Sequence, residues 1–166
     1  MRYLLDKNIV RFALQGLRSG RDRQLTIYEQ DSLFFVQKAY QSGQTLFISY
    51  ASYHIIHRWV DYREIQLLLS MTSVLYPTRY YRRWSRRVRE TAGLSREDSA
   101  MVALGSFGTT KDGELIGVNA VVTFDQPLIN GFHHFQHQLV VRLERMTLQL
   151  NPPFNTVTLP AVFLPS

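Results

Sequence analysis

The chain contains no cysteine among its 166 residues. Disulfide bonds and thiolate metal sites are therefore excluded, and the absence of cysteine fits a reducing compartment. No apolar run approaches the length of about 20 residues that a membrane-spanning helix needs, and residues 1–6 lack the apolar core of a signal peptide. We therefore expect a cytoplasmic protein that has no membrane partner.

Two widespread motifs of enzymes are also missing. The scattered glycines of 16–20 and 105–117 form no G-x-x-x-x-G-K loop that could hold phosphates, and no G-x-S-x-G elbow presents a nucleophilic serine. Nucleoside-triphosphate hydrolases and acyl-transfer enzymes are therefore poor candidates.

What the chain does contain is typical of one globular domain with an excess of positive charge. Hydrophobic residues make up 45% and charged residues 19%, and 166 residues suffice for a single buried core. The formal net charge is +6, which favours a polyanionic partner, nucleic acid first and an anionic membrane second.

Short apolar runs alternate along the chain with segments of helical spacing. Strands are predicted at 2–5, 45–48 and 118–123, and helices at 9–17, 27–40, from 50 onward, 61–73, 79–91 and 95–104. Strands separated by helices, without a series of hairpin turns, predict an α/β fold. We expect a three-layer α/β/α architecture with a mainly parallel central sheet.

The last part of the chain has a weaker pattern. We expect further strands at 138–143 and 147–150 and an irregular end after Pro152-Pro153. The chain is accordingly divided into a domain of residues 1–131 and a C-terminal extension, 132–166, packed on the same domain.

Three aspartates stand at the ends of predicted elements. Asp6 and Asp125 follow predicted strands, and Asp98 falls in the first turn of a helix that Ser95 opens. Ligands of parallel sheets bind at the carboxyl ends of strands, so one crevice can receive all three carboxylates. Such oxygen ligands hold Mg²⁺ or Mn²⁺ for phosphodiester hydrolysis. Each aspartate alone also fits a cap or turn, Asp98 above all, because an acid stabilises the first turn of a helix.

Four segments, taken together and in order, resemble a PIN-domain ribonuclease, the fold of many bacterial toxins of toxin–antitoxin pairs. The segments are Leu4-Leu-Asp-Lys-Asn-Ile9, Phe47-Ile-Ser49, Gly93-Leu-Ser-Arg-Glu-Asp-Ser-Ala100 and Val121-Val-Thr-Phe-Asp125. The resemblance implies a metal-dependent endoribonuclease that uses Mg²⁺ or Mn²⁺ to cleave RNA. It also implies an antitoxin protein and a second copy of the chain, as a homodimer, as further partners.

The resemblance assigns roles to individual residues. It implies that the catalytic and metal-binding acids are Asp6, Asp98 and Asp125, supported by Asn8, Thr123 and Ser49.

The chain departs from the family at one position. The family's second acid, a glutamate in the helix after the second strand, falls near Ile55, where this helix carries no acid. Loss of that ligand should weaken metal binding by about tens-fold. His54 or His57 could compensate and would favour Mn²⁺. The alternative is therefore a catalytically degenerate PIN scaffold that binds RNA or a protein partner without cleavage.

Residues 79–89 contain six arginines. Four of them follow helical spacing and predict one positive face: Arg79, Arg82, Arg83 and Arg86. Three aromatic residues lie between them: Tyr80, Tyr81 and Trp84. Guanidinium groups for phosphates and rings for bases predict RNA binding. A solvated helix face with Trp84 packed inward, an antitoxin-binding surface, and an oligomerisation helix of a purely structural domain are the alternatives.

Overall fold

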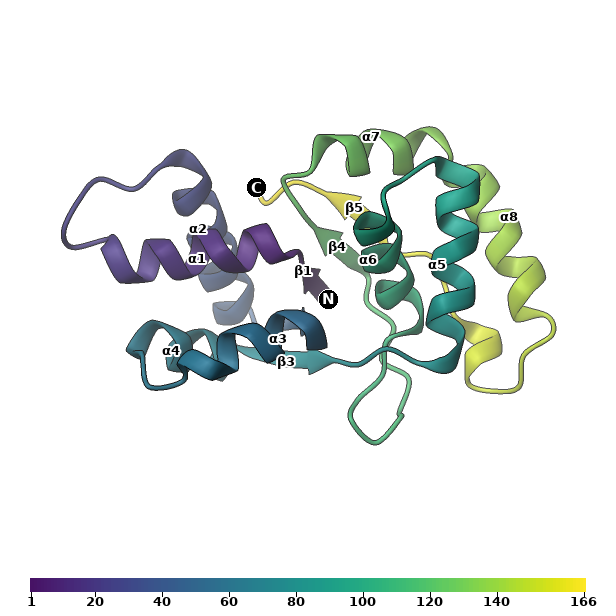
Figure 1. Ribbon diagram of the computed structural model, residues 1–166, viewed down its shortest axis with the longest axis horizontal. Coiled ribbons are helices and arrows are strands. Elements are labelled where there is room, and N and C mark those ends of the chain that lie inside the picture. The colour runs from purple at the N-terminus through teal and green to yellow at the C-terminus, as the bar shows by residue number, and fades with distance from the viewer.

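Five short strands form one sheet at the centre of the protein, which a computed structural model describes over all residues, 1–166 (Figure 1). The strands are β1 Arg2–Leu5, β2 Thr45–Ser49, β3 Thr72–Leu75, β4 Ala120–Val122 and β5 Ala161–Phe163. All neighbours pair in parallel, in the order β3-β2-β1-β4-β5. The expected α/β fold with a mainly parallel sheet is confirmed.

Two helices lie in each of the four connections between consecutive strands, as parallel pairing requires long crossovers. The helices are α1 Lys7–Ser19, α2 Ile27–Gln41, α3 Tyr50–Ile56, α4 Arg63–Met71, α5 Arg79–Ala92, α6 Arg96–Phe107, α7 Gln126–His134 and α8 Gln136–Thr147. Two 3-10 turns complete the elements, η1 His57–Trp59 and η2 Phe154–Thr156. No helix combines the length and the apolar character needed to cross a membrane.

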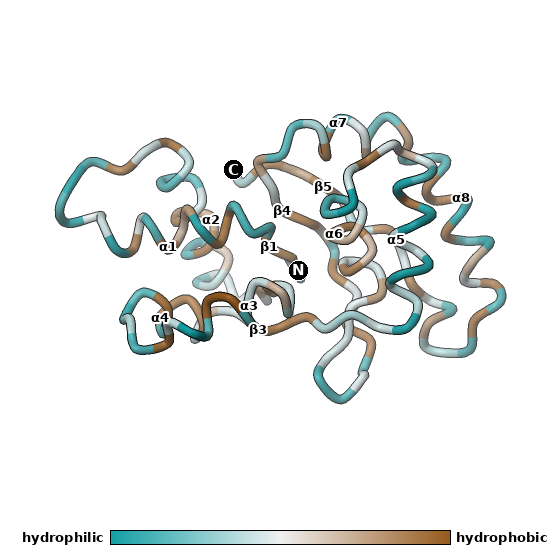
Figure 2. The backbone as a smooth tube through the Cα atoms, viewed as in Figure 1, coloured by the Kyte–Doolittle hydropathy of each residue, from teal (hydrophilic) through white to brown (hydrophobic).

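Each face of the sheet has its own hydrophobic core, because alternate residues of a strand point to opposite faces. On one face Leu4, Phe47 and Val121 pack with buried residues of α5, α6, α7 and α8. On the other face Leu5 and Ile48 pack with buried residues of α1, α2, α3 and α4. Figure 2 shows the hydrophobic strands between these helices and the strongly hydrophilic course of α5. The expected three layers are thus formed.

Local signals set the sharp connection between α5 and α6. Gly93 ends α5 with a φ of 63°, a left-handed conformation that glycine adopts without steric cost. Ser95 then caps α6, its Oγ accepting a hydrogen bond from the backbone N of Asp98 at 3.1 Å. The predicted cap at Ser95 is confirmed. This short connection lays α5 beside α6 and turns the first turn of α6 toward the sheet.

The strands expected at 138–143 and 147–150 are wrong. α8 covers most of this stretch, and residues 148–150 form a turn. Leu139, Leu143 and Met146 are all buried, and their spacing of four and three residues is that of one helix face. The apolar run at 139–141 fits either period on its own, so packing against α5 decides for the helix.

Two strands were missed by the prediction. β3 starts where the helix of 61–73 was expected to continue, because α4 ends at Met71. β5 lies in the end that was expected to be irregular. Each is at an edge of the sheet and pairs with a single neighbour. Elements this short carry little pattern of their own, so the neighbouring strand decides their conformation.

Residues 132–166 contribute to both the core and the sheet. Leu139 and Val162 belong to the same buried cluster as α5 and α6. The backbone N of Thr123 donates to the carbonyl of Phe163 at 3.0 Å. The final strand therefore supports the end of β4, from which two of the predicted site residues, Thr123 and Asp125, follow.

We expect Val162→Asp to unfold the protein far more easily than Ala161→Asp. Val162 is 1% exposed, whereas its neighbour Ala161 on the same strand is exposed. An unpaired buried carboxylate costs about 3–5 kcal/mol, and an exposed substitution changes stability within about 0.5 kcal/mol. Urea denaturation of both variants measures the difference. Equal midpoints would contradict the docking of β5 on the core.

Candidate active site

The order in which strands are added to the sheet changes side between β1 and β4. β2 and β3 are added on one side of β1, and β4 and β5 on the other. In open parallel sheets such a switch point leaves a crevice at the carboxyl ends of the two strands. Asp6 directly follows β1, and Thr123 directly follows β4, so both stand at this point.

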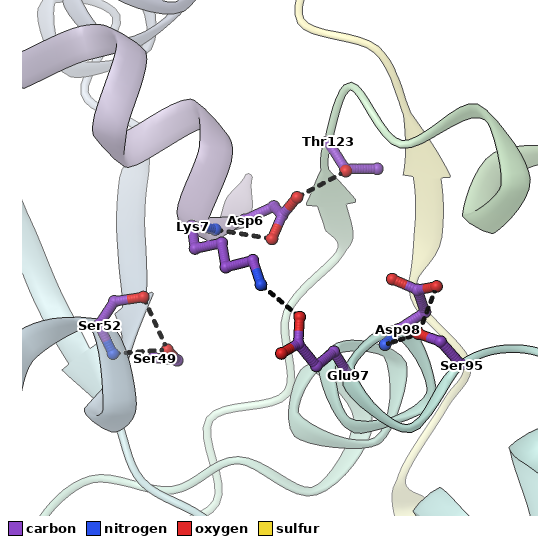
Figure 3. A network of polar contacts seen from close by, with 8 residues as sticks. All are labelled: Asp6, Lys7, Ser49, Ser52, Ser95, Glu97, Asp98 and Thr123. Carbon is purple, nitrogen blue, oxygen red and sulfur yellow. Dashed lines mark hydrogen bonds and ion pairs between the residues drawn. The ribbon is translucent and has the colours of Figure 1, made fainter. Parts of the chain in front are cut away.

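Asp6 is buried at the switch point, with 7% of its surface exposed. Its carboxylate accepts hydrogen bonds from the backbone N of Lys7 at 2.6 Å and from Oγ1 of Thr123 at 2.8 Å (Figure 3). Burial raises the pKa of Asp6 above its ordinary value of 3.8, and the hydrogen bonds from Thr123 and Lys7 oppose that rise. The two hydrogen bonds thus fix the orientation of the Asp6 carboxylate, and its burial lowers the stability of the fold when the carboxylate is charged.

The first turn of α6 supplies a second carboxylate. Asp98 is half-buried, and its Oδ2 accepts a hydrogen bond from Oγ of Ser95 at 2.7 Å. Its charge makes a further, smaller contribution to the raised pKa of Asp6. Figure 3 shows Asp6 and Asp98 projecting from different elements, with the Lys7–Glu97 pair beside them. The expectation that α6 brings Asp98 toward Asp6 agrees with this arrangement.

Sequence reasoning missed two further charges in this crevice. Lys7 and Glu97 form an ion pair between α1 and α6 (Figure 3). The pKa of Lys7 is raised chiefly by its hydrogen bond to Glu97, and the charges of Glu97, Asp6 and Asp98 add to the effect. The same pair lowers the pKa of Glu97. Both side chains are largely exposed, so the pair adds little to stability.

The signal that could have revealed them is adjacency. Lys7 follows Asp6, and Glu97 precedes Asp98, so any crevice that joins the two aspartates also receives these neighbours. Hereafter the acidic crevice means Asp6, Glu97 and Asp98 together with Lys7.

Asp125 performs a different task in the structure. Its Oδ1 accepts a hydrogen bond from the backbone N of Leu128 at 2.9 Å and caps α7. Its own backbone N donates to Oγ1 of Thr123 at 3.0 Å. The Thr123 hydroxyl therefore accepts from the main chain of Asp125 while it donates to Asp6. Asp125 is tied to the crevice through Thr123 and is not packed against the other carboxylates.

The other two residues predicted to support the site are Asn8 and Ser49, and neither has a hydrogen bond to the carboxylates. Asn8 is half-buried in the first turn of α1. Ser49 caps α3, its Oγ accepting from the backbone N of Ser52 at 3.1 Å. Leu5 and Ile48 are paired across β1 and β2, so Ser49 stands beside Asp6 along the edge of the sheet.

α3 brings no acid to the crevice. Ile55 is 62% exposed and lines, with Lys7, an open cavity of about 490 Å³ between α1 and the α3–α4 region. His57 stacks on Tyr53 with ring centroids 5.0 Å apart, and His54 lies 6.1 Å from the ring of Tyr50. Both histidines thus pack beside tyrosines of α3, and their compensating role as ligands stays a prediction.

The donors of the acidic crevice fit Mg²⁺ or Mn²⁺ in chemical type, because these ions prefer carboxylate oxygens. No three acidic or histidine side chains are close enough, as they stand, to hold an ion. The bonding shows why: Glu97 is paired with Lys7, and Asp125 caps α7. An ion held by Asp6, Glu97 and Asp98 would have to replace Lys7 as the partner of Glu97.

The predicted RNA-binding arginines are all exposed on α5: Arg79, Arg82, Arg83 and Arg86. The aromatic residues between them are not available for stacking in the same way. Trp84 is fully buried, and Tyr80 packs on Phe107 and Phe154 with ring centroids 5.9 and 5.0 Å apart. The inward packing of Trp84 that was considered as an alternative is therefore correct. Tyr80 and Tyr81 are half-buried, so none of the three rings is fully exposed for stacking.

No family model matches the chain, and no curated protein matches it significantly in sequence. The resemblance to PIN-domain ribonucleases stays a prediction that rests on the four segments and on the geometry described above.

We expect Asp6→Asn to stabilise the protein at neutral pH but not in acid. Because the pKa of Asp6 is raised above 3.8, the folded state binds this proton more tightly than the unfolded state. The resulting stability is present below 3.8 and is lost as the pH rises through the raised pKa. Asparagine caps a helix as well as aspartate does and cannot ionise.

Urea denaturation in metal-free buffer at about pH 3 and about pH 8 measures the effect, with the exposed Asp22→Asn as the control. A gain in stability that is equal at both pH values would show that the charge of Asp6 is not its source.

Proposed function

We propose that the protein is a toxin-like, divalent-metal-dependent endoribonuclease of the PIN type that hydrolyses phosphodiester bonds of RNA in the acidic crevice. The observation that carries the proposal is the approach of Asp6 and Asp98, from distant parts of the chain, at the switch point of a parallel sheet. Ligand sites of open parallel sheets lie at this position.

A purely structural role explains Asp6 poorly. Capping of α1 needs only a side-chain oxygen, which asparagine or serine supplies without a buried charge. Instead the fold buries a carboxylate whose pKa is raised by that burial, and Thr123 holds its orientation. Ionisable groups with perturbed pKa values in a crevice are typical of functional sites.

Each residue of the crevice has a role in the proposed reaction. Asp6, Asp98 and Glu97 would hold Mg²⁺ or Mn²⁺, with Glu97 supplying the acid that α3 lacks. A divalent ion in such a site polarises a scissile phosphate and activates water. Thr123 keeps Asp6 in position through its hydrogen bond of 2.8 Å. Lys7, once released from Glu97, leaves an ammonium group beside the site that can bind a phosphate oxygen.

The second candidate is a degenerate scaffold that binds RNA or a protein partner without cleavage. Two observations favour it: Lys7 already neutralises Glu97, and α3 supplies Ile55 where the family has its second acid. Because Lys7 already neutralises part of the negative charge of the crevice, a metal ion would gain less by binding there. The two candidates differ in whether RNA is cut, so they are separated by direct assay.

Cleavage of a labelled single-stranded RNA tests the first candidate. We expect cutting with Mn²⁺ or Mg²⁺, none with EDTA, and a loss of at least about 100-fold in Asp6→Asn and Asp98→Asn, because each removes a metal-holding carboxylate. Asp112→Asn, in an exposed turn, is the control. Metal-independent cutting, or full activity in both variants, would refute the proposed site.

Ile55→Glu tests whether the missing acid limits the protein. Ile55 is 62% exposed, so glutamate can replace it without opening the core, and Ile27→Glu, at a site 68% exposed, is the control. We expect Mn²⁺ to bind Ile55→Glu about 10-fold more tightly, with a parallel rise in cleavage. Titration calorimetry measures the affinity. An unchanged affinity for Mn²⁺ would show that this position does not face the metal site.

A further inference from the structure

Seven arginines crowd the surface of α5 and the start of α6 without acidic partners. They are Arg79, Arg82, Arg83, Arg86, Arg87, Arg89 and Arg96. The ion pairs of the protein are Lys7–Glu97, Arg23–Glu29 and Arg142–Glu90, and none includes these seven. Like charges one turn apart destabilise a helix. A surface of this kind is the footprint of a polyanion that neutralises it.

Four of these arginines share one groove between α5 and α6. The groove has a volume of about 650 Å³ and contains no acidic side chain. We call it the arginine groove, and its four arginines are Arg82, Arg86, Arg89 and Arg96. Burial raises the pKa of Tyr81 in this groove, and the charges of Arg96 and Arg82 oppose the rise, as expected if both surround its hydroxyl. Converging guanidinium groups match phosphate in shape and charge.

The arginine groove and the acidic crevice share the first turn of α6. Arg96 is the first residue of α6, and Glu97 and Asp98 are the next two. α5 and α6 run side by side (Figure 1), and the groove between them includes Arg96, in the same turn of α6 as Glu97 and Asp98. A strand that leaves the groove at Arg96 therefore reaches the helix turn that carries the two carboxylates.

An aromatic pair borders the crevice from other strands. Tyr50 follows β2 and Tyr76 follows β3, and their rings are 5.1 Å apart at an angle of 32°. Tyr50 is 43% exposed. Neighbouring strands are about 4.8 Å apart, so the backbone of these residues stands one and two strand spacings from Asp6 along the edge. Exposed rings beside a backbone-binding surface are how proteins stack unpaired bases.

We propose that the protein binds a single nucleic-acid strand along this edge, with phosphates in the arginine groove and an unpaired base on Tyr50 and Tyr76. The proposal rests on the proposed function for the position of the scissile phosphate at the acidic crevice. A duplex keeps its bases stacked inside and offers none to Tyr50, so the geometry selects an unpaired strand, and the proposed function makes that strand RNA.

Fluorescence anisotropy in EDTA, over a series of salt concentrations, tests binding separately from cleavage. The probes are a labelled single-stranded RNA and its duplex. For R82Q/R86Q we expect weaker binding and a salt slope smaller by about 1.4, since each phosphate contact on a single strand contributes about 0.7. R83Q/R87Q removes the same charge from the same helix outside the arginine groove and is the matched comparison. Arg83 was among the arginines predicted to bind RNA, and the present proposal gives it a smaller contribution than the groove. Its slope should change less.

Tyr50→Ala should weaken binding of the single strand by about 5- to 100-fold without changing the salt slope, because stacking releases no counterions. Tyr40→Ala, at a site 51% exposed on α2, is its control and should bind as the wild type does. Thermal unfolding of each variant confirms that it is folded before binding is compared.

Three outcomes would overturn the proposal. Equal effects of R82Q/R86Q and R83Q/R87Q would indicate a diffuse positive surface. Duplex bound as tightly as the single strand would remove the selectivity. Stronger binding to vesicles that contain phosphatidylserine, through the same arginines, would assign the surface to a membrane. Single-strand binding as expected but without cleavage in Mn²⁺ would reject the proposed nuclease and leave this inference standing.

Discussion

The parallel pairing of β1 with β4 is the constraint on which the site depends. It joins segments 117 residues apart, as the Thr123–Asp6 hydrogen bond shows. The backbone N of Asp6 donates to the carbonyl of Val122 at 3.0 Å, so the pairing continues to the point where both strands end. Without it there would be no switch point, no partner for the Asp6 carboxylate and no common edge for α1 and α6.

Charge is divided unevenly over this frame. Carboxylates gather where β1, β4 and α6 meet, while α5 carries arginines that have no acidic partner. Both arrangements cost the isolated protein stability: one buries a carboxylate, and the other places like charges a turn apart. A bound polyanion would relieve the repulsion among the arginines, and a bound divalent ion would stabilise the carboxylates. Under the proposed function, the acidic crevice and the arginine groove are parts of one binding surface.

The two candidate functions differ in what happens to the ion pair between Lys7 and Glu97. The ammonium of Lys7 neutralises Glu97 in the absence of any ligand and feels the charges of Asp6 and Asp98 as well. In a nuclease this pair is a resting arrangement that an ion and a phosphate replace. In a binding scaffold the same pair is the permanent state of the crevice. The exposed Ile55 on α3 bears on the same two candidates, because it stands where the family resemblance leads one to expect a metal-binding acid.

Much of the fold was open to prediction because its signals are local. The strand of residues 2–5, the caps at Ser49 and Ser95 and the glycine end of α5 are encoded within a few neighbouring residues. The alternation of strands and helices then gave the α/β class. The positions of Asp6 and Asp98 at element ends were likewise predictable, because the strand before Asp6 and the capping serine before Asp98 are neighbours in the sequence.

Other features exist only through contacts between distant segments. β3 and β5 are strands because β2 and β4 pair with them, and α8 is a helix because its buried face packs beside α5. The Lys7–Glu97 pair, the capping role of Asp125 and the burial of Trp84 also depend on such contacts. The sequence by itself determined the elements with strong local signals and the acids beside their ends. Tertiary structure decided which acids meet, because long-range pairing and burial leave no mark on the residues next to them.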